Sequence, residues 1–198
     1  MSFFDDNGKV GLALMIIGII GLIVAVASIV IAFTDDTVNT GATVANAIGG
    51  LIFGILIFLF GQNVRGGSND KVGIVSGLVR VIGVATILSA IFVAISSWLA
   101  SNSIGTGIVT AIVNIIIGLI LLWIAAKIAG QSKNVISNVI WVLLVIISLV
   151  LAILSLIGIF AIFAGNIVGG IQSLCWFFVY VYLFIAALSP EVKSAMGI

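Results

Sequence analysis

Six long apolar runs limit what this chain can fold into more than any other feature of its sequence. Each run reaches the roughly 20 residues that an α-helix needs to cross about 30 Å of hydrocarbon. Because the runs are continuously apolar, they favour helices over the strands of a β-barrel, in which polar and apolar residues alternate. The sequence therefore predicts an all-α integral membrane protein with six transmembrane helices, near residues 10–33, 42–60, 72–99, 104–128, 135–163 and 167–188.

The composition agrees with a chain whose solvent is the lipid bilayer. Of the 198 residues, 63% are hydrophobic and 7% are charged, values that are far from those of soluble globular domains. The net charge of +1 gives no sign of a nucleic-acid partner. Outside the runs there is room only for the termini and short connections, so we expect residues 1–198 to form a single membrane domain.

The basic residues predict which side of the membrane each connection faces. Three connections, near residues 34–41, 100–103 and 164–166, contain no Lys or Arg. By the positive-inside rule these connections face out, and both termini are cytoplasmic in a multi-pass protein of the cell membrane. Apart from Arg80, the basic residues all lie at or beside the termini and connections of the opposite side: Lys9, Arg65, Lys71, Lys127, Lys133 and Lys193.

A repeated entry sequence predicts how the six helices are organised. Residues 6–11 read DNGKVG and residues 68–73 read SNDKVG, and a long apolar run follows each. The chain then reads as three tandem helical hairpins, with units of about 7–62, 69–131 and 133–189. Since each unit crosses the membrane twice, successive units enter in the same orientation and are parallel repeats.

An asparagine in the second helix of each predicted hairpin precedes a glycine by four residues: Asn46, Asn114 and Asn166. These candidate intramembrane polar residues could converge around a pseudo-threefold axis as a polar ring. Alternatively, each forms an interhelical hydrogen bond worth about 0.6 kcal/mol, or, for Asn166, caps the last span. We favour the second interpretation. Trp176 lies near the middle of the last span, where its indole N–H needs a partner.

Arg80 is the only ionisable residue well inside a predicted span. A charge in that position is a candidate functional site, at a cost of roughly 2.5–3.5 kcal/mol at a helix centre. It lies nine residues after Lys71, however, so its long side chain could instead extend to the cytoplasmic interface. We favour that anchoring role over an interior one.

Small residues form a stripe along the first predicted helix and recur in the second. Such residues let two backbones approach closely, which is how helices associate when lipid removes the hydrophobic drive between them. We expect these residues to serve helix packing rather than ligand binding: Gly18, Gly21, Ala25 and Ser28 in the first helix, Gly50 and Gly54 in the second.

The inventory of reactive groups is short. The chain has no His, one Cys and no acidic residue inside any run, so zinc sites, di-iron sites and proton-relay carboxylates lack their parts. We therefore expect no enzymatic activity, no catalytic residues, no cofactor and no metal. In layout alone, the three hairpins resemble the small acid-resistance membrane proteins of bacteria, a likeness that implies no residue roles.

These observations favour a non-enzymatic structural or accessory subunit of a membrane assembly. Its expected partners are the lipid bilayer and either copies of itself, in a homo-oligomer, or a larger membrane-protein complex. The alternative is a passive channel or carrier for a small neutral solute, which the asparagines and glycine-rich helices would serve.

Overall fold

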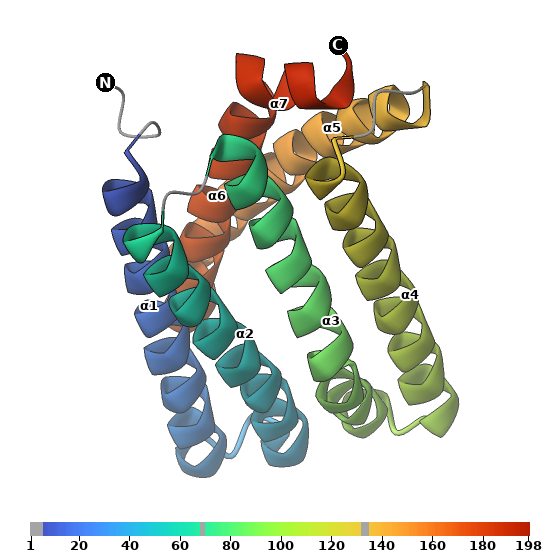
Figure 1. Cartoon of the computed structure of the whole chain (residues 1–198). Coiled ribbons are helices and arrows are strands. Elements are labelled where there is room, and N and C mark those ends of the chain that lie inside the picture. The colour runs from blue at the N-terminus through green and yellow to red at the C-terminus, as the bar shows by residue number, and fades with distance from the viewer. Residues whose placement is uncertain (1–5, 68–69, 132–134) are drawn as a thin grey trace.

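The computed structural model describes residues 6–67, 70–131 and 135–198, and within these residues the protein is entirely helical (Figure 1). Six helical segments are long and apolar enough to cross a membrane, so the prediction of six membrane-length helices is confirmed. The elements are α1 (Asn7–Thr34), α2 (Thr40–Gly66), α3 (Lys71–Ser101), α4 (Ile104–Ala129), α5 (Val135–Ile159), the 3-10 helix η2 (Phe160–Ala164), α6 (Ile167–Ala187) and α7 (Pro190–Met196). The predicted unit boundaries at residues 69 and 133 lie outside the described residues.

Polar side chains fix where the helices begin. Before six of the helices, a side-chain oxygen accepts a hydrogen bond from a backbone N–H of the first turn, which has no partner within the helix. The turns between paired helices are short, as the sequence predicts. The N-cap residues are Asp6, Asn39, Asp70, Ser103, Asn166 and Ser189.

The long helices pack as antiparallel neighbours. The most extensive contacts join α1 to α2 and α3 to α4, followed by α2 to α3 and α5 to α6, and a smaller contact joins α1 to α6. Figure 1 shows the start of α1 and the end of α7 at one end of the bundle, which we call the terminal end. The α1–α2 and α3–α4 turns lie at the opposite end, the turn end, where Asn39 Nδ2 donates to the Leu99 carbonyl at 3.0 Å.

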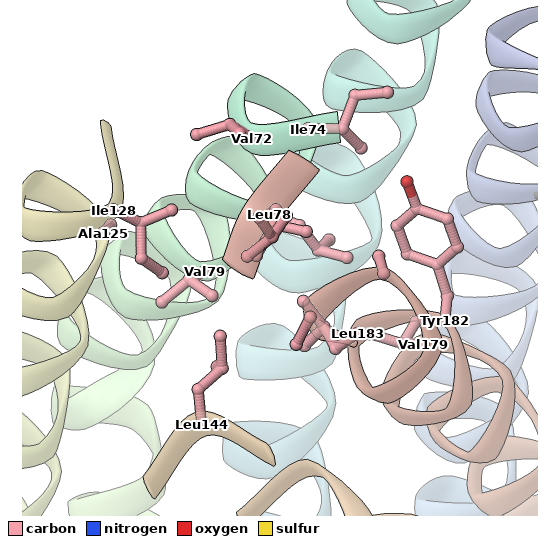
Figure 2. Packing of buried hydrophobic residues seen from close by; sticks show 14 of the residues in the cluster. Val72, Ile74, Leu78, Val79, Ala125, Ile128, Leu144, Val179, Tyr182 and Leu183 are labelled. Atoms are coloured by element: carbon pink, nitrogen blue, oxygen red, sulfur yellow. The ribbon is translucent and has the colours of Figure 1, made fainter. Parts of the chain in front are cut away.

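The best-packed part of the core lies in the terminal half of the bundle. Side chains of α3, α4, α5 and α6 meet there, as Figure 2 shows for Leu78, Ile128, Leu144 and Val179. The exposed fraction of Leu78 and Ile128 is 0% and that of Val179 is 1%. This half of the bundle is therefore filled by side chains.

The short helix α7 closes the terminal end, a feature that the sequence analysis did not predict. Its residues Val192 and Met196 are both 0% exposed within the core. The connection into α7 is held by Trp141, whose indole Nε1 donates to the carbonyl of Ala187 at 2.7 Å. An ion pair of 3.6 Å between Lys71 Nζ and Glu191 Oε1 joins α7 to the start of α3.

Candidate functional site

A polar cavity lies inside the bundle, nearer the turn end than the filled core. It encloses about 210 Å³ and is lined by residues of α1, α2, α3, α4 and α6. Each helix pair contributes an amide side chain: Asn46 from α2, Asn114 from α4 and Gln172 from α6. The structure thus brings two of the three predicted asparagines together and adds a glutamine that the sequence analysis missed. The available signal was that Gln172 is the only glutamine inside the apolar runs.

The amide groups of Asn46 and Gln172 face the cavity without a protein partner. Both side chains are exposed and line the cavity, and neither makes a hydrogen bond to any described residue. At 1.5 Å per helical residue, Asn46 lies about 9 Å along α2 from the start of that helix, and Gln172 lies about 8 Å along α6 from its start. An amide without a hydrogen bond in an apolar medium costs several kcal/mol. Both amides are therefore free to hydrogen-bond to molecules that enter the cavity.

Other polar side chains at the cavity use their protons within their own helices. Asn114 Nδ2 donates to the carbonyl of Thr110 at 2.8 Å. The hydroxyls of Thr86 and Ser28 donate to carbonyls four residues earlier, at 2.8 Å and 2.9 Å. Their oxygen atoms remain available as hydrogen-bond acceptors toward the cavity.

Aromatic residues form the wall of the cavity that lies deepest in the bundle. The rings of Phe53 in α2 and Trp176 in α6 stack with centroids 4.2 Å apart, and Trp176 stacks on Tyr180 at 5.2 Å. Phe53 and Trp176 both line the cavity. The indole N–H of Trp176, which the sequence analysis marked as needing a partner, donates to no described residue. Trp176 thus adds a third unpartnered donor among the residues that line this space.

Asn166 and Arg80 lie away from the cavity lining. Asn166 is the N-cap of α6, where its Oδ1 accepts from the backbone N–H of Gly169 at 2.9 Å. Arg80 is an exposed residue of α3, and its side chain makes no ion pair within the described part of the chain. The three asparagines therefore do not form one ring.

The six predicted packing residues lie where α1 meets α2 and at the cavity beside that contact. A Cβ atom at Gly18 would lie 2.8 Å from the carbonyl oxygen of Gly54, so the two backbones are already as close as glycine allows. The small stripe of α1 thus faces the partner helix of its own hairpin. Four of the six residues also line the cavity: Gly21, Ala25, Ser28 and Gly50.

The cavity does not continue as a polar path toward the terminal end. The residues that follow it in that direction belong to the apolar core, including Ile57, Leu78 and Val179, which are 0–1% exposed. In this conformation no polar path leads through the described residues from the cavity to the terminal end.

Comparison with known proteins gives no further guide to the site. No protein-family model, curated protein or solved structure matches this chain.

Proposed function

We propose that this protein is a non-enzymatic integral membrane protein that serves as a structural or accessory subunit of a membrane assembly. The observation that carries the proposal is the exposure of α4 and α5. Only 17% of the apolar window of each is buried within the described structure, the smallest share among the six membrane-length segments. Each of the two helices packs mainly on one neighbour, α4 on α3 and α5 on α6.

The seam between α4 and α5 is the part of the surface that this proposal assigns to a partner. Figure 1 shows the two helices close together at the terminal end and far apart toward the turn end. Large apolar side chains of both helices are exposed, including Ile112, Ile116, Ile146 and Ile153, each 50–52% exposed. A second copy of this chain, or a larger subunit, would bury these side chains by close helix packing.

Native mass measurement after extraction with a mild detergent tests the accessory role. A homo-oligomer or a complex of fixed stoichiometry is expected. Ile116→Gln in α4 should release the subunit, whereas Ile23→Gln on the exposed face of α1, where the side chain is 62% exposed, should not. A single chain under every mild extraction condition would refute the proposal.

The proposed orientation has both termini in the cytoplasm. It is supported by the charges outside the spans, since Lys9 and Lys193 lie next to the chain termini while Asp35 and Asp36 lie in the α1–α2 turn. Basic residues are retained on the cytoplasmic side during membrane insertion. The terminal end is then the cytoplasmic end and the cavity belongs to the outer half.

The proposed organisation as three parallel hairpin repeats is supported by glycine contacts in the first two. A Cβ at Gly83 in α3 would lie 3.0 Å from the carbonyl oxygen of Gly118 in α4. Gly18 of α1 stands in the same relation to Gly54 of α2, at 2.8 Å. Independent expression of residues 70–131 as a stable hairpin would support a repeat origin.

A passive channel or carrier for a small neutral solute is the second candidate, and the polar cavity favours it. Such a function requires a second conformation in which the terminal half opens. It predicts that liposomes with the protein take up water, glycerol or urea faster than empty liposomes, and that Asn46→Leu with Asn114→Leu abolishes the difference. Equal permeability of protein-containing and empty liposomes would refute this candidate for those solutes.

A further inference from the structure

An apolar groove joins the polar cavity at the seam between α1 and α6. The groove has a volume of about 400 Å³ and is lined by residues 10–20 of α1 and residues 174–182 of α6. Ile17 and Cys175 line both the groove and the cavity, so the two spaces meet at these side chains. Ile16 and Phe178 at the groove are 48% and 55% exposed, which opens it to the surrounding lipid.

The two spaces differ sharply in chemistry. The cavity has the unpartnered amides of Asn46 and Gln172 and the indole N–H of Trp176, whereas the groove is lined by apolar side chains except for Tyr182. No Asp, Glu, Lys or Arg lines either space. A charged group placed there would lose its hydration without a counter-charge, which is far more costly than placing a neutral polar group. An occupant is therefore neutral, with one polar end and one apolar end.

The depths of the two spaces set the orientation of the occupant. Along α1, the cavity-lining residues run from Ser28, about 9 Å from the turn end of that helix, to Ile17, about 26 Å from it. The groove begins at Ile20, about 21 Å from the turn end of α1, and continues to Val10, about 36 Å from it. In a bilayer with about 30 Å of hydrocarbon, the polar end would lie in the outer half and the apolar end would pass the midplane.

We infer that the cavity and the groove together form a binding site for a neutral, single-tailed lipid with a compact, oxygen-bearing head. The head takes hydrogen bonds from Asn46, Gln172 and Trp176, and the tail lies between α1 and α6. A long-chain quinone and a long-chain alcohol share this chemistry. The site goes beyond the accessory role and does not depend on it.

Hydrogen bonds to the head provide most of the binding free energy, and the tail determines how the lipid reaches the site. A tail leaving lipid for the groove exchanges one apolar surrounding for another, so it gains little free energy. Each hydrogen bond to the head satisfies an amide or indole that otherwise has no partner, a net gain of about 1 kcal/mol or somewhat more. The tail keeps the molecule dissolved in the bilayer, from which it can enter sideways through the groove.

Fluorescence quenching of Trp176 measures occupancy of the site directly. In a protein with phenylalanine at positions 98, 123 and 141, Trp176 is the only tryptophan. In phosphatidylcholine nanodiscs, decylubiquinone should quench this tryptophan to saturation. Dodecanol should displace the quinone if the site accepts alcohols and should leave it bound if the site selects the quinone head. Either result supports the site and identifies the head.

Matched variants separate the two parts of the site. Asn46→Leu or Gln172→Leu should weaken decylubiquinone binding about fivefold, the loss of one hydrogen bond. Asn63→Leu, an exposed position of α2 outside the cavity lining, should leave it unchanged. Ala13→Phe fills the groove and should weaken binding of the tailed quinone, whereas Val26→Phe on the exposed face of α1 should not.

Three outcomes would overturn the inference. Quenching that rises linearly with quinone concentration would show only collision within the bilayer. A tailless dimethoxy-methyl-benzoquinone that binds as tightly as the tailed form at equal membrane concentration would reduce the site to one for small solutes. If Asn46→Leu, Gln172→Leu and Asn63→Leu bind decylubiquinone equally well, with unchanged helical content, then the two cavity amides do not contribute to binding.

Discussion

Replacing Gly18 by alanine should separate α1 from α2, and the structure allows the effect to be estimated. A Cβ atom at this position would lie 2.7 Å from the backbone nitrogen of Phe58 and 2.8 Å from the carbonyl oxygen of Gly54. Ordinary contacts of a Cβ atom begin at 3.4 Å. The atoms in the way belong to the backbone, so no side-chain rotation relieves the overlap, and the helices must move apart by about 0.7 Å.

The matched control is Gly21→Ala, one turn further along the same face of α1. Its Cβ atom would lie 3.6 Å from the Cα atom of Gly54, an ordinary van der Waals contact. Alanine is favoured over glycine in a helix by up to about 1 kcal/mol, a gain that both variants share. Overpacking costs about 1–3 kcal/mol and applies only to Gly18→Ala. The two variants should therefore differ by about 1–3 kcal/mol in the free energy of unfolding.

The buried thiol of Cys175 provides the assay. It is the only cysteine and is 8% exposed, so a thiol-reactive dye labels it fully only when the bundle opens. Thermal unfolding in detergent micelles should give a lower midpoint for Gly18→Ala than for the wild type, and an equal or higher midpoint for Gly21→Ala. Circular dichroism checks that both variants begin with the same helical content. If the unfolding midpoint of Gly18→Ala equals the midpoints of Gly21→Ala and the wild type, the inferred close approach of α1 and α2 is wrong.

Three further predictions concern the two ends of the bundle. Trp141→Phe removes the donor to the Ala187 carbonyl, so it should cost about 1 kcal/mol and raise amide hydrogen exchange in α7. Hydrogen bonds from the hydroxyl and the backbone N–H of Thr37 lower the pKa of Asp35 below 3.8. The stabilisation they provide is therefore present above pH 3.8 and is lost as the pH falls through the lowered value, and the unfolding midpoints of wild type and Asp35→Ala should converge in acid. In a cysteine-free background, Thr37→Cys should react with an impermeant reagent in intact cells and Ser194→Cys should not; the reverse pattern would invert the proposed orientation.

Much of the fold could be predicted because the signals are local. The lengths of the apolar runs predicted six membrane-length helices. Capping residues such as Asp70, whose side chain accepts from the backbone N–H of Gly73 at 2.7 Å, mark where helices begin. A cap acts on the next three residues and needs no tertiary contact. The same signal, Ser189 followed by Pro190, marks the start of α7, although no helix was predicted after residue 188.

The candidate site could be predicted only in part. Asn46, Asn114 and Asn166 share one sequence pattern, yet two line the cavity and the third caps α6. Asn166 lies directly before α6. The nearest donor to its side-chain oxygen is therefore a backbone N–H in the first turn of that helix. Gln172, which belongs to no repeat pattern, takes the corresponding place in the cavity.

The sequence by itself determined the number, length and helical state of the membrane-length segments, because in hydrocarbon each backbone N–H and C=O has to be satisfied within its own segment. Only the tertiary structure decided which faces meet. Lipid tails are as apolar as leucine, so hydrophobicity does not distinguish a side chain that faces lipid, such as Ile23 at 62% exposure, from one that faces protein, such as Ile57 at 0%. That choice depends on how closely pairs of helices can approach, as at Gly18 and Gly54, and close approach is a property of two segments rather than of either one alone.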